Sequence, residues 1–128
     1  GLIVGKLGGS PSPAPQGWAE FCEHHAAPEL SKLDYVCRAI TPPHRARRFD
    51  ARFFFAFADE VLLDDRPHRS SGEILDIEWF DFAQAAALDL PTVTRIVIGE
   101  VKKRLDGEKV EPKFLRWQRG MKGLGAEG

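Results

Sequence analysis

Residues 49–58 read FDARFFFAFA, and this stretch decides how the rest of the chain is interpreted. Every second position from Phe49 to Phe57 is apolar, whereas Asp50 and Arg52 fall between them. A period of two residues indicates a β-strand. The second face also turns apolar toward the end of the stretch. We therefore expect a central strand that is covered on both faces at its end and opens into a pocket at its polar beginning.

Three successive aromatic residues, Phe53–Phe55, lie in this strand. Such a run can serve as a base-stacking platform in nucleic-acid-binding proteins. The alternation places Phe53 and Phe55 on the same face as Phe49 and Phe57, which is what a core face requires. We interpret them as core residues, with Arg48, Asp50 and Arg52 sharing the opposite face.

The flanking sequence predicts a mixture of strands and helices. Before the central strand, the pattern of residues 33–40 is that of a strand with Tyr35 and Cys37 on one face, and nothing earlier reads as a strand. The further elements that we expect are a short helix at 18–25, a strand at 73–80, a short helix at 82–88, a helix at 91–105 and an edge strand at 114–118. The fold class is therefore α+β, in one domain spanning residues 1–128.

Two helices carry specific signals. Asp81 can cap the helix at 82–88, with Gln84 three residues later completing a capping box. In the helix at 91–105, which Pro91 opens, apolar residues recur at helical spacing. This stripe comprises Val93, Ile96, Val97, Val101 and Leu105.

The remaining stretches have loop composition. Residues 8–17, GGSPSPAPQG, predict a flexible loop, and the adjacent prolines within 41–47 predict a second loop. Residues 59–72 are expected to form a polar connection, and the Gly-rich residues 119–128 a frayed tail.

The charge and the cysteine content of the chain exclude some classes of function. The chain has 128 residues, with 18 Lys and Arg against 19 Asp and Glu, so no net field favours nucleic acid or an anionic membrane. Cys22 and Cys37 are too few for a disulfide scaffold and suit a reducing compartment. No apolar run approaches the roughly 20 residues that span a bilayer. We expect a cytoplasmic protein.

Arginines gather around the start of the central strand. Arg47, Arg48 and Arg52 surround Asp50, and Arg38 lies on the preceding strand. Guanidinium groups bind phosphate oxygens in a two-point geometry, so the cluster is a candidate phosphate site. The alternative is a solvated loop whose arginines pair with surface carboxylates.

A family resemblance favours the first interpretation. Residues 38–55, RAITPPHRARRFDARFFF, resemble the strand, loop and strand that follow the catalytic helix in a subgroup of Nudix hydrolases. GEILDIEWFDFAQAAAL at 72–88 and LPTVTRIVIGEVKKRL at 90–105 are similar to the next strand, the short helix and the closing helix of that fold. The resemblance covers roughly residues 18–118 and is most specific in RRFDARFF.

The resemblance implies a fold, an activity and roles for residues. The fold is an α/β/α sandwich with a mixed sheet, and the activity is metal-dependent hydrolysis of a nucleoside diphosphate linked to another group. Arg38, Arg47, Arg48 and Arg52 would bind the diphosphate, and Asp50 would orient Arg47, Arg48 and Arg52.

The sequence departs from the family in one large respect. The Nudix signature, G-x5-E-x7-R-E-U-x-E-E-x-G-U with U aliphatic, is absent, and only Gly1-Leu2 could match its end. The chain would then lack the front portion of the fold. The glutamates that hold Mg²⁺ or Mn²⁺ would lie upstream, in a missing N-terminal segment of the same protein. We expect this chain alone to be inactive and to bind no metal through three or more of its own side chains.

Two further groups are weaker candidates. Glu73 shares its predicted strand face with inward residues and is a candidate catalytic base, although it could also cap a turn or face solvent. The run Cys22-Glu23-His24-His25 holds metal-ligand residue types. Adjacent histidines on a helix diverge by about 100°, so an exposed helix end accounts for the run better than a metal site does.

Two alternatives to a hydrolase stay open. The chain could be a non-catalytic nucleotide-binding or interaction module that keeps the pocket and lacks the metal site, or it could be a purely structural fragment. A homodimer is a further option for its assembly. Nucleotide binding without turnover would identify the first alternative, and the intact mass of the purified protein would identify the second.

Overall fold

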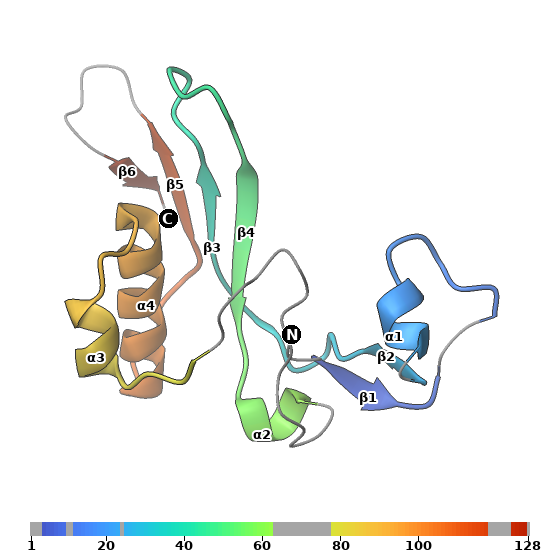
Figure 1. The fold of residues 1–128 in the computed structure, drawn as a ribbon. Coiled ribbons are helices and arrows are strands. Elements are labelled where there is room, and N and C mark those ends of the chain that lie inside the picture. The colour runs from blue at the N-terminus through green and yellow to red at the C-terminus, as the bar shows by residue number, and fades with distance from the viewer. Residues whose placement is uncertain (1–3, 10–11, 24, 63–77, 118–123, 128) are drawn as a thin grey trace. The chain divides into compact units, whose positions relative to one another are not determined.

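The computed structural model describes residues 4–9, 12–23, 25–62, 78–117 and 124–127, and Figure 1 shows their helices and strands. In chain order the elements are β1 (Gly5–Leu7), α1 (Ala19–Glu23), β2 (Ala26–Pro28), β3 (Asp34–Ile40), β4 (Asp50–Phe55), α2 (Ala58–Val61), α3 (Phe82–Ala87), α4 (Thr92–Leu105), β5 (Lys113–Trp117) and β6 (Leu124–Glu127). They fall into two units: Gly1–Leu33 with Ala56–Phe80, and Asp34–Phe55 with Asp81–Gly128.

The first unit contains a small sheet that the sequence analysis does not predict. β1 and β2 pair antiparallel, with Lys6 opposite Ala27, and β2 buries Ala26 and Ala27. Each of these strands has three residues, which is too short for an alternating pattern to be recognised. The expectation of no strand before Leu33 is therefore wrong. The short helix expected at 18–25 is present as α1.

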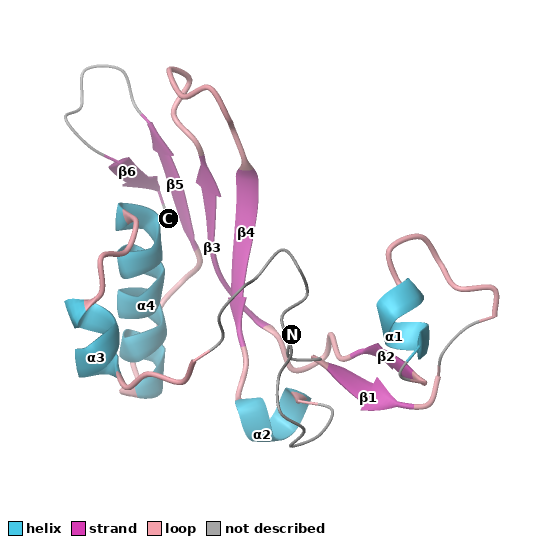
Figure 2. Ribbon diagram, in the orientation of Figure 1, coloured by secondary structure: helices cyan, strands magenta, loops and turns pink. Residues whose placement is uncertain are grey.

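The second unit contains a four-stranded mixed sheet with the order β4-β3-β5-β6. β3 pairs antiparallel with β4 and parallel with β5, and β5 pairs antiparallel with β6. Figure 2 shows this sheet together with α3 and α4. The predicted combination of helices with a mixed sheet is confirmed at this level.

The helices of the second unit form close to where the sequence predicts them. Asp81 accepts a hydrogen bond from the Gln84 backbone nitrogen at 2.7 Å, and Gln84 accepts one from the Asp81 backbone nitrogen at 2.9 Å. The predicted capping box of α3 is thus confirmed. Arg95 of α4 donates to the carbonyl oxygens of Ala86, at 3.0 Å, and Leu88, which fastens α3 to α4. Figure 1 shows α4 lying along the sheet.

The core of this unit lies between the sheet and α4. Its buried residues are Val36, Cys37, Ala39 and Leu115, against which the half-buried Phe53, Phe55, Val93, Ile96, Val97 and Val101 pack. Four residues of the predicted α4 stripe therefore do contact the core. Leu105 is the exception: it is 44% exposed in the last turn of α4.

β4 differs from its prediction in length and position. It spans Asp50–Phe55 instead of residues 49–58, because the chain leaves the sheet before Phe57 and α2 begins at Ala58. Phe49 and Phe57 consequently lie outside the strand and are 64% and 49% exposed. Among the described strands β4 is at the edge of the sheet, so the expected central position is wrong.

A β-bulge in β3 breaks the predicted alternation. Tyr35 lies opposite Phe54, and Cys37 lies opposite Phe53, the residue directly before Phe54. Two steps along β3 therefore match one step along β4, and Val36 is the additional residue. Val36 and Cys37 are both buried, whereas Tyr35 is 38% exposed. Tyr35 therefore leaves the face on which the sequence pattern placed it.

The end of the chain is also more regular than expected. β5 was predicted as an edge strand, yet it lies between β3 and β6. β6 forms within residues 119–128, where a frayed tail was expected. The pairing uses backbone groups, so the Gly-rich composition conceals it. Of the strand predicted at 73–80, residues 73–77 lie outside the described part, and residues 78–80 have no regular structure.

None of the described helices has the length and apolar character needed to cross a membrane.

Candidate functional site

Polar and aromatic side chains gather on the sheet face opposite the core, which we call the open face. Strand register places Arg38 beside Arg52 on β4 and beside Phe114 on β5. Neighbouring strands turn paired residues to the same face, and residues two apart on one strand share it as well. The open face includes Tyr35, Arg38, Ile40, Asp50, Arg52, Phe54, Phe114 and Arg116, and Glu127 of β6 is the strand partner of Phe114.

Arg38 and Asp50 form a two-point ion pair at this face. The Arg38 Nε donates to Asp50 Oδ1 at 2.7 Å, and Nη2 donates to Oδ2 at 2.6 Å. These hydrogen bonds hold the pKa of the Asp50 carboxyl below its ordinary value and raise the pKa of Arg38. Both oxygens of Asp50 are thereby engaged by one guanidinium, which fixes the orientation of Arg38.

Phe114 lies next to two arginines. The guanidinium carbon of Arg38 is 5.1 Å from the ring centroid, and that of Arg116 is 5.7 Å away. Both distances fall within the range of cation–π attraction. The phenyl ring therefore helps to hold positive charge on this part of the sheet.

Arg52 is the exposed arginine of the β4 strand. Its positive charge lowers the pKa of Asp50, so it lies within electrostatic reach of the ion pair. Within the described residues, its guanidinium has no hydrogen-bonding or ion-pair partner. Arg52 can therefore offer its donors to a ligand without first breaking a contact to another described residue.

Arg47 and Arg48 lie outside this arrangement. β4 begins at Asp50, so the expected common strand face for Arg48, Asp50 and Arg52 is wrong for Arg48. The Arg48 Nε donates to the Thr41 carbonyl oxygen at 3.3 Å, and the Thr41 hydroxyl oxygen accepts from the Phe49 backbone nitrogen at 2.9 Å. These contacts brace the loop between β3 and β4. Arg47 is exposed in that loop.

The candidate base and the thiol–histidine run give no assembled site. Glu73 lies outside the described residues, and so does His24. Within the part of the chain that the structure describes, no group of three or more His, Cys, Asp or Glu side chains could hold a metal ion. Neither Cys22 nor Cys37 is joined in a disulfide, and burial raises the pKa of Cys37.

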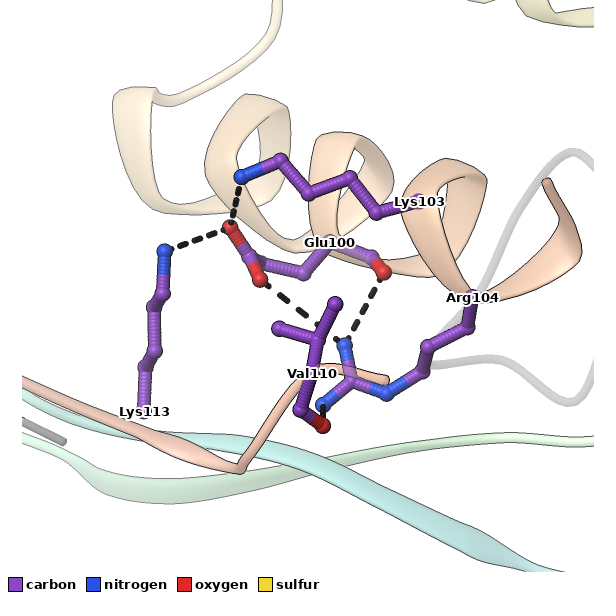
Figure 3. Close-up of polar contacts among 5 residues, drawn as sticks. All are labelled: Glu100, Lys103, Arg104, Val110 and Lys113. Atoms are coloured by element: carbon purple, nitrogen blue, oxygen red, sulfur yellow. Dashed lines mark hydrogen bonds and ion pairs between the residues drawn. The ribbon is translucent and has the colours of Figure 1, made fainter. Parts of the chain in front are cut away.

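A second charged cluster lies on the core side of the sheet and was not anticipated. Glu100 of α4 is 4% exposed. Its Oε1 accepts hydrogen bonds from Lys103 at 3.0 Å and from Lys113 of β5 at 2.7 Å. Arg104 approaches Oε2 to 3.8 Å and donates to the Glu100 backbone oxygen at 2.9 Å. Figure 3 shows the three cations converging on the one acidic residue.

Two opposing effects set the protonation of Glu100. Burial would raise its pKa, but the hydrogen bonds and charges of Lys113 and Lys103 outweigh burial and lower it. Glu100 is therefore a carboxylate at neutral pH. Its Oε2 has no hydrogen-bond partner among the described residues. The cluster joins α4 to β5 beside the core and serves the fold.

The sequence contained partial signals for the residues that were missed. Phe114 and Arg116 are two apart in KFLRW, as a shared strand face requires. Their proximity to Arg38 follows from the parallel pairing of β3 with β5, which no local pattern reveals. Glu100 falls at helical spacing within the apolar stripe of α4, which is a detectable sign of burial.

Comparison of the chain with protein-family models, with curated proteins and with solved structures finds no match.

Proposed function

We propose that the open face binds a nucleoside diphosphate linked to another group, with the diphosphate held at Arg52 and Arg116. The observation that supports this most strongly is the charge of the face, where three guanidinium groups accompany the carboxylate of Asp50. Asp50 neutralises Arg38, and the exposed guanidinium of Arg52 adds positive charge beside this pair. An anion with several oxygen acceptors complements it.

The arginines have different roles in this proposal. Arg38 is a positioning residue, because its Nε and one terminal nitrogen are engaged by Asp50. Arg52 is the principal ligand-binding residue, since its donors are unengaged within the described residues. Arg48 holds the adjacent loop through Thr41, and Arg47 would reach a ligand only from that loop.

The resemblance of residues 38–55 extends the proposal to an activity. In the intact protein we expect a Nudix-type enzyme that hydrolyses the bound diphosphate with Mg²⁺ or Mn²⁺. The finer fold would be a Nudix-like α/β/α sandwich, in which α3 and α4 belong to one helical layer. The second helical layer would lie over the open face, with the bound diphosphate between it and the sheet. This layer and the metal-binding glutamates would be supplied by residues other than those described. Glu73 stays a candidate base.

The described residues do not fit the metal that such chemistry requires. Asp50 lies on the open face, and Arg38 occupies both of its oxygens. This engagement of Asp50 favours a second candidate function, which is a nucleotide-binding module without turnover.

Titration calorimetry with ADP-ribose tests the binding proposal. Charge-assisted hydrogen bonds are worth roughly 1.5–3 kcal/mol, so Arg52→Ala should weaken binding about 10- to 150-fold. Arg52→Lys should recover part of the loss, because an ammonium cannot make the planar two-point contact. Lys109→Ala removes an exposed positive charge elsewhere in the second unit and should leave affinity unchanged.

The outcomes separate the candidate functions. Equal affinity of the wild-type protein, Arg52→Ala and Lys109→Ala would contradict a diphosphate site at Arg52. Binding that is followed by release of AMP with Mg²⁺ or Mn²⁺ in the intact protein would identify a hydrolase. Binding without AMP release in the intact protein would identify the non-catalytic module.

A further inference from the structure

Two exposed aromatic rings lie on the open face beside the arginines. Tyr35 of β3 and Phe54 of β4 are directly opposite each other, with ring centroids 5.4 Å apart and planes inclined by 43°. They are 38% and 49% exposed. Nothing in the core accounts for them, because the neighbouring Phe53 turns to the α4 side and packs there. The pair is available to a ligand.

The position of this pair relative to Arg52 matches the layout of a nucleotide. Phe54 follows Arg52 by two residues on the same strand and the same face, which corresponds to about 7 Å along the sheet. A nucleotide has its flat base separated from its first phosphate by one ribose, over a similar length. Aromatic rings stack on bases of any identity, because every base has a π-face.

We propose that Tyr35 and Phe54 form the base subsite of the open face, so that this face selects diphosphates that carry a nucleoside over diphosphates that do not. This inference rests on the proposed function, since it takes Arg52 as the diphosphate site. The subsite offers stacking surface, with one phenolic hydroxyl as its hydrogen-bonding group. It therefore recognises the presence of a base with little discrimination among bases.

The β-bulge of β3 creates the subsite. In a regular strand without the bulge, Tyr35 and Cys37 would be two residues apart on one face, so Tyr35 would turn into the core. The bulge instead buries both Val36 and Cys37 and leaves Tyr35 beside Phe54. Bulges commonly redirect a side chain in this way next to functional sites.

Calorimetry of the full 128-residue chain with ADP, UDP and inorganic pyrophosphate tests the inference. Phe54→Leu keeps an apolar side chain at this position and removes the ring. Stacking contributes enough that this variant should bind ADP and UDP about 5- to 140-fold more weakly. Its affinity for pyrophosphate should not change. Phe82→Leu makes the same substitution at a 40% exposed position on α3 and should bind all three ligands as the wild type does.

Each outcome decides between the two proposals. Loss of ADP and UDP binding alone supports the base subsite. Wild-type binding of ADP and pyrophosphate with equal affinity, unchanged in Phe54→Leu, overturns the subsite and leaves the diphosphate site at Arg52 intact. Absence of wild-type binding to all three ligands overturns both. Equal weakening of all three by Phe54→Leu also overturns the subsite, because a ring that merely supports the sheet would act in that way.

Discussion

The two faces of the four-stranded sheet use charge in opposite ways. On the covered face, the carboxylate of Glu100 is almost fully buried and receives two lysines and an arginine. On the open face, the carboxylate of Asp50 engages Arg38, and the exposed Arg52 lies within electrostatic reach of it. Glu100 is surrounded by cations in the first case, whereas the exposed Arg52 in the second has no ion-pair partner among the described residues.

This difference between the two clusters indicates which of them can bind an anion. The cations around Glu100 are directed to a buried carboxylate and to backbone carbonyls such as that of Val110, so their removal should affect folding. Arg52 is directed to solvent, so its removal should affect a ligand. The number of basic residues does not distinguish the two clusters. Burial and existing partners do.

The largest expected effect is on the covered face, at Leu115. This residue is 1% exposed in the core between β5 and α4. Leu115→Ala removes buried apolar volume and should lower the free energy of unfolding by about 3 kcal/mol. Urea denaturation measures this loss of unfolding free energy, with Phe114→Ala on the open face as the comparison. A larger loss for Phe114→Ala would reverse the assignment of covered and open faces.

Glu100→Gln should give a smaller loss. Removing one partner of a buried ion pair costs about 3–5 kcal/mol, but Lys103 and Lys113 can reach solvent, and we expect about 2 kcal/mol. Asp106→Asn breaks the exposed pair with Lys102 and should cost less than about 0.5 kcal/mol. Equal losses in the two variants would contradict a structural role for the buried carboxylate.

The same cluster predicts how stability depends on pH. The folded-state pKa of Glu100 lies below its ordinary value of 4.5, so its contribution is fully present above that pH. The contribution is lost as the pH falls through the folded-state pKa, because the unfolded chain takes up the proton first. The difference between wild type and Glu100→Gln should therefore shrink on going from about pH 7 to about pH 3. A difference that grows toward acid would show that burial dominates.

The smallest expected effect on stability is that of Arg52→Ala. An exposed side chain without partners among the described residues contributes within about 0.5 kcal/mol, although the same variant should lose ligand affinity. Thermal unfolding and calorimetry on one preparation measure both quantities. A clear fall in the melting temperature with unchanged affinity would make Arg52 a structural residue and remove the proposed diphosphate site.

The sequence patterns predicted elements better than their neighbours in space. The capping box at Asp81 and most of the apolar stripe of α4 follow from local spacing, and both are confirmed. Asp50 was expected to orient Arg47, Arg48 and Arg52, whereas its hydrogen-bonding partner in the structure is Arg38. Phe114 and Arg116 lie beside Arg38 because β3 pairs with β5. These two strands are far apart in the sequence, so no local sequence pattern predicts this pairing.

What the residues alone specify is the type of each longer element and the sign of the local charge. Periodicity, caps and turn residues act between near neighbours along the chain. Tertiary packing decided the bulge at Val36, the position of β4 at the sheet edge, and the burial of Glu100. Each of these features depends on contacts between residues that are distant in the sequence. The free energy that stabilises them therefore arises only when the sheet and the helix pack together.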